Sequence, residues 1–145
     1  MPDVSIIITS GEPAGVGPDI IAAIDPARFD ARLVVIGDFE LLAARAAALG
    51  SGTEYIEYGS QTVSNRRLEV IHQPLAHPCV PGRLDSANAE YVLQLLERAC
   101  RACLSGEFDA MVTAPVQKEI INRAGIDFSG HTEFLAGICE VPKPV

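Results

Sequence analysis

The sequence is short of positive charge. Its 145 residues contain 11 Lys and Arg against 19 Asp and Glu, which gives a formal net charge of −8. Arg66 and Arg67 form the only adjacent basic pair. Binding to nucleic acid requires clustered Lys and Arg to contact phosphates, so we expect no nucleic-acid partner. A small anionic substrate stays open, because local donors matter more to such a ligand than net charge does.

Long hydrophobic runs are also missing. The first apolar stretch, residues 4–8, is too short for the core of a signal peptide, and residues 1–3 lack a basic side chain. No other window approaches the length of a membrane-spanning helix. We therefore expect no membrane partner and a cytoplasmic location.

Cysteine and histidine are few and poorly placed for a metal site or a disulfide framework. Cys79, Cys100, Cys103 and Cys139 do not have the spacing of a small secreted protein. The Cys100–Cys103 pair is expected within a helix and has no second pair to complete a zinc site. His72 and His77 are five residues apart in a proline-rich stretch, so we interpret them as loop histidines. We expect no metal ligand in this chain.

What the chain does contain is an alternation of apolar runs and amphipathic segments. An apolar fraction of 48% supports one packed core. Strands alternating with helices predict an α/β fold with a mostly parallel sheet and helices on both faces. The expected strands cover residues 4–9, 33–37, 68–71 and 108–113. The expected helices cover residues 18–24, 39–49, 86–104, 116–124 and 132–139. The stretch 51–82 gives only the one strand.

A glycine- and proline-rich loop, residues 10–19, directly follows the first expected strand. In parallel α/β sheets, ligands bind at the carboxyl ends of strands, and the turn 113–115 is expected at the same edge. The Gly-x-x-x-Gly-x-Gly spacing of Gly11, Gly15 and Gly17 fits neither a Rossmann fingerprint nor a Walker loop. Two interpretations remain: backbone amides that bind an anion, or a tight turn whose glycines serve backbone geometry alone. Glu12 is a candidate cleft residue.

Two later features carry polar side chains that suit a site. Residues 130–133, Gly-His-Thr-Glu, place His131 and Thr132 at an expected helix start, where they suit a phosphate or a substrate hydroxyl. The alternative is that Thr132 or Ser129 only caps the helix. Lys118 follows the strand end at 113 and is a candidate for pairing with an anionic substrate, or else a solvated helix lysine.

Four stretches, taken in order, resemble the 4-hydroxythreonine-4-phosphate dehydrogenase family. They are residues 8–19 (Ile-Thr-Ser-Gly-Glu-Pro-Ala-Gly-Val-Gly-Pro-Asp), 99–108, 112–118 and 121–134, the last ending in the Gly-His-Thr-Glu motif. The resemblance covers almost the whole chain, but only the first half, or slightly less, of a family member. The sequence is therefore interpreted as the N-terminal part of a two-domain dehydrogenase, with a boundary toward the second domain near residues 115–130.

The resemblance implies a fold like that of the isocitrate and isopropylmalate dehydrogenases, here incomplete. It also implies NAD-dependent oxidation, with decarboxylation, of 4-phosphohydroxy-L-threonine in pyridoxal 5′-phosphate biosynthesis. Family members are homodimers and use a divalent metal such as zinc, magnesium or cobalt. The family's His-Thr pair contacts substrate, and this role carries over to His131 and Thr132. The three metal-binding histidines of the family come later than this motif, so the 145 residues alone are expected to be inactive.

Two departures from the family pattern leave the substrate open. Gln117 stands where the family usually has His, and Glu119 stands where it usually has Gly. Relatives act on threonate or erythronate phosphates, or on aromatic cis-dihydrodiols, and these remain alternatives. A different class of function, a binding or assembly module without catalysis, also remains.

Overall fold

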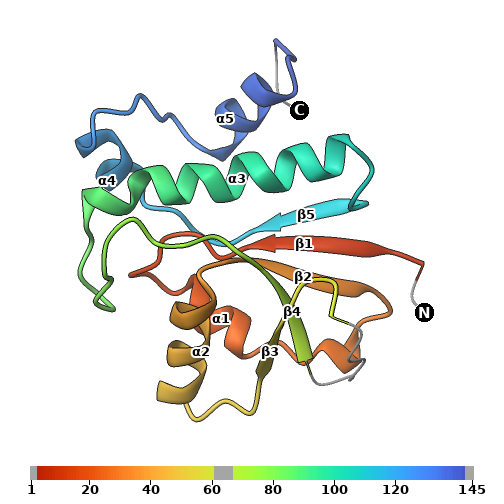
Figure 1. Ribbon diagram of the computed structural model, residues 1–145. Coiled ribbons are helices and arrows are strands. Elements are labelled where there is room, and N and C mark those ends of the chain that lie inside the picture. Colours follow the sequence, from red (N-terminus) through yellow and green to blue (C-terminus); the bar gives the residue numbers. More distant parts are fainter. Residues whose placement is uncertain (1–2, 61–66, 143–145) are drawn as a thin grey trace.

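The computed structural model describes residues 3–60 and 67–142 and shows a parallel five-stranded sheet (Figure 1). The strand order is β3-β4-β2-β1-β5, and every neighbouring pair is parallel. The expected fold class, a mostly parallel sheet covered by helices on both faces, is confirmed. The strands are β1 (Ser5–Thr9), β2 (Arg32–Gly37), β3 (Glu54–Glu57), β4 (Arg67–His72) and β5 (Ala110–Thr113).

Helices cover both faces of this sheet. In Figure 1, α1 and α2 lie on one face, and α3 crosses the other with α4 and α5 beyond it. None of the helices in the two described ranges is both long enough and apolar enough to span a membrane. The helices are α1 (Gly17–Ala22), α2 (Phe39–Ala48), α3 (Ala89–Leu104), α4 (Lys118–Arg123) and α5 (His131–Ile138), with short 3₁₀ turns η1 (Pro26–Arg28) and η2 (Ser86–Asn88).

Alternating side chains of the central strands divide the core into two clusters. Ile7 and Val34 point toward α3 and are fully buried there with Leu95. Ile8 and Val35, the next residue in each strand, point to the opposite face, toward Leu42 of α2. Successive strand residues face opposite sides of a sheet, so strands apolar throughout require helices on both sides.

Capping residues fix where several helices begin. Asp38 accepts a hydrogen bond at 2.9 Å from the Leu41 amide and begins α2, which starts at residue 39 as the sequence predicts. Gln117 accepts one at 2.7 Å from the Ile120 amide and begins α4. The N-cap of α5 is Gly130, without a side-chain cap bond, so the cap interpretation of Ser129 or Thr132 was wrong.

The structure corrects several other expectations. The stretch 51–82 contains a second strand, β3, at the edge of the sheet. The first helix ends at Ala22 rather than at residue 24, and the expected helix 86–104 begins as the separate turn η2. His72 is the last residue of β4 rather than a loop residue. The expectation of a domain boundary near residues 115–130 stays a prediction.

Candidate functional site at the carboxyl edge of the sheet

Strands β1 and β5 are neighbours, so the loop after β1 lies against the turn after β5. The Ala114 amide donates to the Thr9 carbonyl at 3.1 Å, and the Glu12 amide donates to the Pro115 carbonyl at 3.0 Å. Gly11 has a φ of 71°, and a Cβ at this position would overlap the Pro115 carbonyl oxygen. Glycine is therefore required here both for backbone conformation and for close approach.

Some of the loop's backbone amides have partners within the protein. The Ala14 amide donates to the Glu12 carboxylate at 3.1 Å, and the Gly15 amide donates to the Glu12 carbonyl at 3.0 Å. The Ser10 amide donates to the Ile36 carbonyl at 3.1 Å. Amides that already have protein partners are poor ligands for a phosphate. The Val16 and Gly17 amides, at the start of α1, have no hydrogen-bond partner among the described residues, so the anion-binding interpretation stays open beside the tight turn.

Arg45 of α2 holds the residue 10–19 loop in place. Its guanidinium donates to the Pro13 and Gly15 carbonyls at 2.8 and 2.9 Å and pairs with Asp19 at 2.8 Å. The residue is buried, with 7% of its surface exposed. A planar guanidinium can satisfy three acceptors in fixed directions, which an ammonium cannot do equally well. Sequence reasoning missed Arg45, because an arginine in an alanine-rich helix resembles an exposed one.

Glu12 lies beneath the surface between this loop and residues 77–85. It is 5% exposed, and its burial raises its pKa, although the hydrogen bond from Ala14 opposes this and the charge of Asp85 adds to it. The Gly82 amide donates to the Ala14 carbonyl at 2.8 Å, so the proline-rich stretch packs directly on the loop. Glu12 is thus placed at the carboxyl edge, and its role in a cleft stays a prediction.

A buried tyrosine connects α3 to the ends of β1 and β2. The Tyr91 hydroxyl accepts from the Asp38 amide at 2.9 Å and lies 3.4 Å from Ser10 Oγ. Burial raises the pKa of Tyr91 to about 12, so the hydroxyl stays protonated. Asp38 also accepts from the Leu75 amide at 2.9 Å. Tyr91 was not identified from sequence, because its position in the helix fits an ordinary core residue.

His131 and Thr132 lie on the outer side of α3, at the start of α5. In Figure 1, α3 lies between α5 and the sheet. Thr132 is exposed, whereas His131 is half-buried beside Phe128, with ring centroids 6.4 Å apart. The His131 Nε2 atom is buried and has no hydrogen-bond partner within the described residues. A buried polar atom without a partner is destabilising, and a ligand group would satisfy Nε2 once a turn of the ring brought this atom to the surface.

Lys118 begins α4 directly after the β5 turn, and its side chain is exposed. Among the described residues it has no ion pair with a carboxylate. Gln117, which accepts the cap bond from the Ile120 amide, begins the helix that carries Lys118. Lys118 remains a candidate for contact with an anion.

The other histidines have local partners. His72 Nδ1 accepts from the Phe39 amide at 3.0 Å, and His77 Nδ1 lies 3.2 Å from Asp85. Residues 3–60 and 67–142 contain no group of three or more His, Cys, Asp or Glu that could hold a metal ion. The side chains present therefore do not fit a metal centre on their own.

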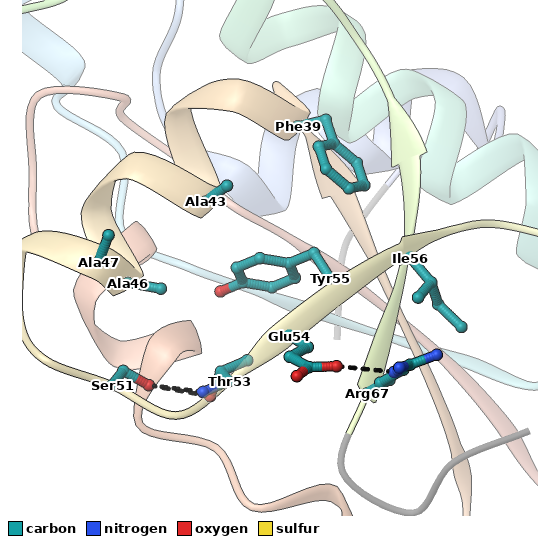
Figure 2. A pocket seen from close by; sticks show the side chains of 10 residues that line it. All are labelled: Phe39, Ala43, Ala46, Ala47, Ser51, Thr53, Glu54, Tyr55, Ile56 and Arg67. Carbon is teal, nitrogen blue, oxygen red and sulfur yellow. Dashed lines mark hydrogen bonds and ion pairs between the residues drawn. The ribbon is translucent and has the colours of Figure 1, made fainter.

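A hollow of about 510 Å³ lies away from this edge, between α2 and β3 (Figure 2). The Tyr55 ring points into it, and the Glu54–Arg67 ion pair, at 2.8 Å, borders it. The Tyr55 hydroxyl is buried without a hydrogen-bond partner in the described part of the chain, and burial raises its pKa to about 12. Ser51 and Thr53 lie at the amino end of β3, so this hollow does not join the candidate site.

Comparison with known proteins places these features in a family. The model of the family described as "Pyridoxal phosphate biosynthetic protein PdxA" matches residues 30–145. The chain is 49% identical over 144 residues to a 4-hydroxythreonine-4-phosphate dehydrogenase of Vibrio cholerae, covering 97% of this chain and 44% of that protein. It is 54% identical over 141 residues to the protein of the same name from an Azoarcus species, covering 97% of this chain and 43% of the relative.

The fold agrees with a solved structure. A crystal structure of a 4-hydroxythreonine-4-phosphate dehydrogenase from Burkholderia phymatum matches with a TM-score of 0.86 and 28% sequence identity. The match covers 97% of this chain and 44% of the crystallised one. The chain therefore spans less than half the length of these relatives.

Proposed function

The chain belongs to the pyridoxal phosphate biosynthetic protein PdxA family, and we propose that it is the N-terminal part of a 4-hydroxythreonine-4-phosphate dehydrogenase. The observation that carries this proposal is identity of about half over 97% of the chain with relatives of that name. The structure supports it by fixing the residue 10–19 loop and the residue 113–115 turn against each other. The departures at Gln117 and Glu119 leave threonate and erythronate phosphates as second candidates.

The proposed reaction is oxidation of 4-phosphohydroxy-L-threonine by NAD, followed by decarboxylation of the oxidised product. NAD, when bound, accepts the hydride, while the protein supplies binding and orientation. The described residues do not form a metal site, so no step is assigned here to a divalent ion. The ligands of that ion are proposed to lie outside these 145 residues, and the residues that bind NAD are not assigned.

His131 and Thr132 are proposed to bind the phosphorylated substrate. Thr132 is exposed at the start of α5, and His131 Nε2 has unused hydrogen-bonding capacity in the described structure. The two residues provide a hydroxyl and an imidazole within one turn, which suits a phosphate oxygen or a substrate hydroxyl. Phe128 packs against the His131 ring and restricts its orientation.

Glu12 and Lys118 are proposed to lie at the border of the cleft. Lys118 is exposed beside the β5 turn, where its ammonium can attract an anionic substrate. Glu12 is held within the loop by its bond to the Ala14 amide, so it orients the loop backbone. A homodimeric, cytoplasmic enzyme is part of the same proposal.

The test uses the protein encoded by the complete reading frame that contains these residues. NADH formation is measured by absorbance with 4-phosphohydroxy-L-threonine, with unphosphorylated 4-hydroxy-L-threonine and with erythronate 4-phosphate. Turnover of the first substrate alone supports the proposal, and preferential turnover of erythronate 4-phosphate overturns the substrate assignment. No NADH with any of them overturns the dehydrogenase assignment.

Variants of the same protein test the binding residues. His131→Ala and Thr132→Ala should each lower kcat/KM about 10–100-fold, the equivalent of one hydrogen bond to a charged group. Asp127→Asn is the matched control, because it is an exposed neighbour that carries no proposed role. Equal effects of all three variants would contradict a specific role for His131 and Thr132.

A further inference from the structure

Two cysteines from different helices meet on the outer side of α3. Cys100 Sγ lies 3.6 Å from Cys139 Sγ, although the residues are 39 positions apart in the chain. Cys100 is in the C-terminal half of α3, and Cys139 is the C-cap of α5. Both are free thiols in the structure. A disulfide requires the sulfur atoms to be about 2.05 Å apart, so the two sulfurs must move closer by roughly 1.5 Å for the bond to form.

We propose that Cys100 and Cys139 are an oxidative modification site, whose disulfide ties the end of α5 to α3. The candidate is specific among the four cysteines. Cys103 is one helical turn from Cys100 on α3, but the sulfur that lies close to Cys139 is that of Cys100. Cys79 lies in the residue 77–85 stretch, where burial and then the charge of Glu12 raise its pKa, so it lies near the residue 10–19 loop rather than at the end of α5.

The surroundings of the two sulfurs set the order of reaction. Cys139 is half-buried at a helix end, whereas Cys100 is 4% exposed beneath it. Burial raises the pKa of Cys100 to about 11, with the neighbouring Cys139 contributing, so Cys100 is a thiol at neutral pH. The more accessible Cys139 is therefore the sulfur that meets the oxidant first, and Cys100 is the resolving partner.

The oxidant in this scheme is a hydroperoxide such as hydrogen peroxide. The Cys139 sulfur, on losing its proton, attacks one peroxide oxygen; the O–O bond breaks, hydroxide leaves as water after taking up a proton, and Cys139 becomes a sulfenic acid. The Cys100 sulfur then attacks the Cys139 sulfur, the S–O bond breaks, and the departing hydroxide takes the Cys100 proton. Overall, two thiols are oxidised to one disulfide, and one peroxide is reduced to two waters.

The consequence is a restraint on the helix that begins with His131. Apart from the two cysteines, Phe134 of α5 packs against the core cluster that contains residues of α3, and Ala136 is the buried residue of α5. A covalent bond at its far end limits opening of α5 away from α3. Any effect of this restraint on substrate affinity rests on the proposed function, whereas formation of the disulfide does not.

The experiment treats this 145-residue chain with hydrogen peroxide, digests it with trypsin without reduction, and identifies linked peptides by mass. Cleavage after Arg98 and Arg101 puts Cys100 and Cys103 on different peptides, so the partner of Cys139 is assigned unambiguously. The expected product links the peptide of residues 99–101 to the peptide that contains Cys139, with a loss of about 2 Da. Hydrogen exchange of α5 amides should be several-fold slower in the oxidised chain and should return on reduction.

Cys103→Ser is the matched control and should leave the linked peptide and the slow exchange unchanged. Cys139→Ser and Cys100→Ser should each abolish the linked peptide and the slow exchange. If the buried Cys100→Ser variant folds poorly, Cys139→Ser still tests the proposal. A link through Cys103 or Cys79, sulfonic acid without a link, or unchanged α5 exchange after linking would each overturn the proposal. Because neither readout requires turnover, these results are independent of the dehydrogenase assignment.

Discussion

At Gly17 the loop passes so close to Ser10 that no side-chain carbon has room. An added Cβ would overlap the Ser10 carbonyl oxygen and lie 3.0 Å from the Ala114 Cβ. Both neighbours are fixed, because Ser10 and Ala114 bond to strand backbone. The requirement for glycine at this position is therefore steric.

Gly17→Ala should lower the free energy of unfolding by about 1–3 kcal/mol, the cost of overpacking a fixed backbone. Urea unfolding followed by circular dichroism measures the change. Gly52→Ala is the control, because nothing lies within 4 Å of its added Cβ. Equal stability of the Gly17→Ala variant and the native chain would show that the loop can move away from Ser10.

Glu12 makes a second prediction at the residue scale, in the pH dependence of stability. Its pKa is raised in the folded chain, so the folded state binds the proton more tightly than the unfolded state. The energetic penalty of the buried carboxylate is absent below the ordinary pKa of 4.5 and is complete above the raised folded value. The native chain should therefore gain stability relative to Glu12→Gln as the pH falls through this window.

Urea unfolding at a series of pH values tests the Glu12 prediction by the difference between the two proteins. Glu133→Gln, an exposed carboxylate, is the control and should show no such trend. A difference between Glu12→Gln and the native chain that does not vary with pH would contradict the raised pKa.

At the scale of the element, Arg45 makes α2 a support for the loop after β1. It contacts two loop carbonyls and the Asp19 carboxylate of α1. Arg45→Lys should lower the free energy of unfolding by about 2–3 kcal/mol, because one ammonium leaves buried acceptors without a donor. Chemical denaturation measures this.

Arg101→Lys provides the comparison for Arg45→Lys. Arg101 pairs with Glu97 on the exposed surface of α3, at 3.0 Å, and the change should alter stability by less than about 0.5 kcal/mol. If the two substitutions cost the same, the guanidinium of Arg45 is not the source of the stability.

The elements also show what sequence can predict. Runs such as residues 33–36 are apolar throughout, so β2 was predicted almost to the residue. β3 was missed because Glu54, Tyr55, Ile56 and Glu57 form no apolar run, and within the described ranges the strand pairs with β4 alone. Residues 54–57 form a strand because they pair in register with β4, and the local sequence does not encode this pairing. The same applies to the contacts of Arg45 and Tyr91, which arise only when distant elements pack.

At the scale of the whole molecule, the chain spans under half of its relatives, and its described residues hold no metal cluster. We predict that the 145 residues alone form no NADH from 4-phosphohydroxy-L-threonine with NAD and a divalent metal. The complete reading frame is the positive control. Metal- and NAD-dependent turnover by the 145-residue chain would contradict the assignment of the missing ligands to a later segment.

The position of β1 between β2 and β5 has a consequence for the order of folding. The β1–β2 pair joins residues about one helix apart in the chain, whereas the Ser5 amide bonds to the Asp109 carboxylate across 104 positions. During synthesis on a ribosome, the edge of β1 that pairs with β5 stays unpaired until α3 and β5 have been synthesised. High contact order of this kind slows folding, and until β5 arrives, β1 exposes an unpaired edge to other nascent chains.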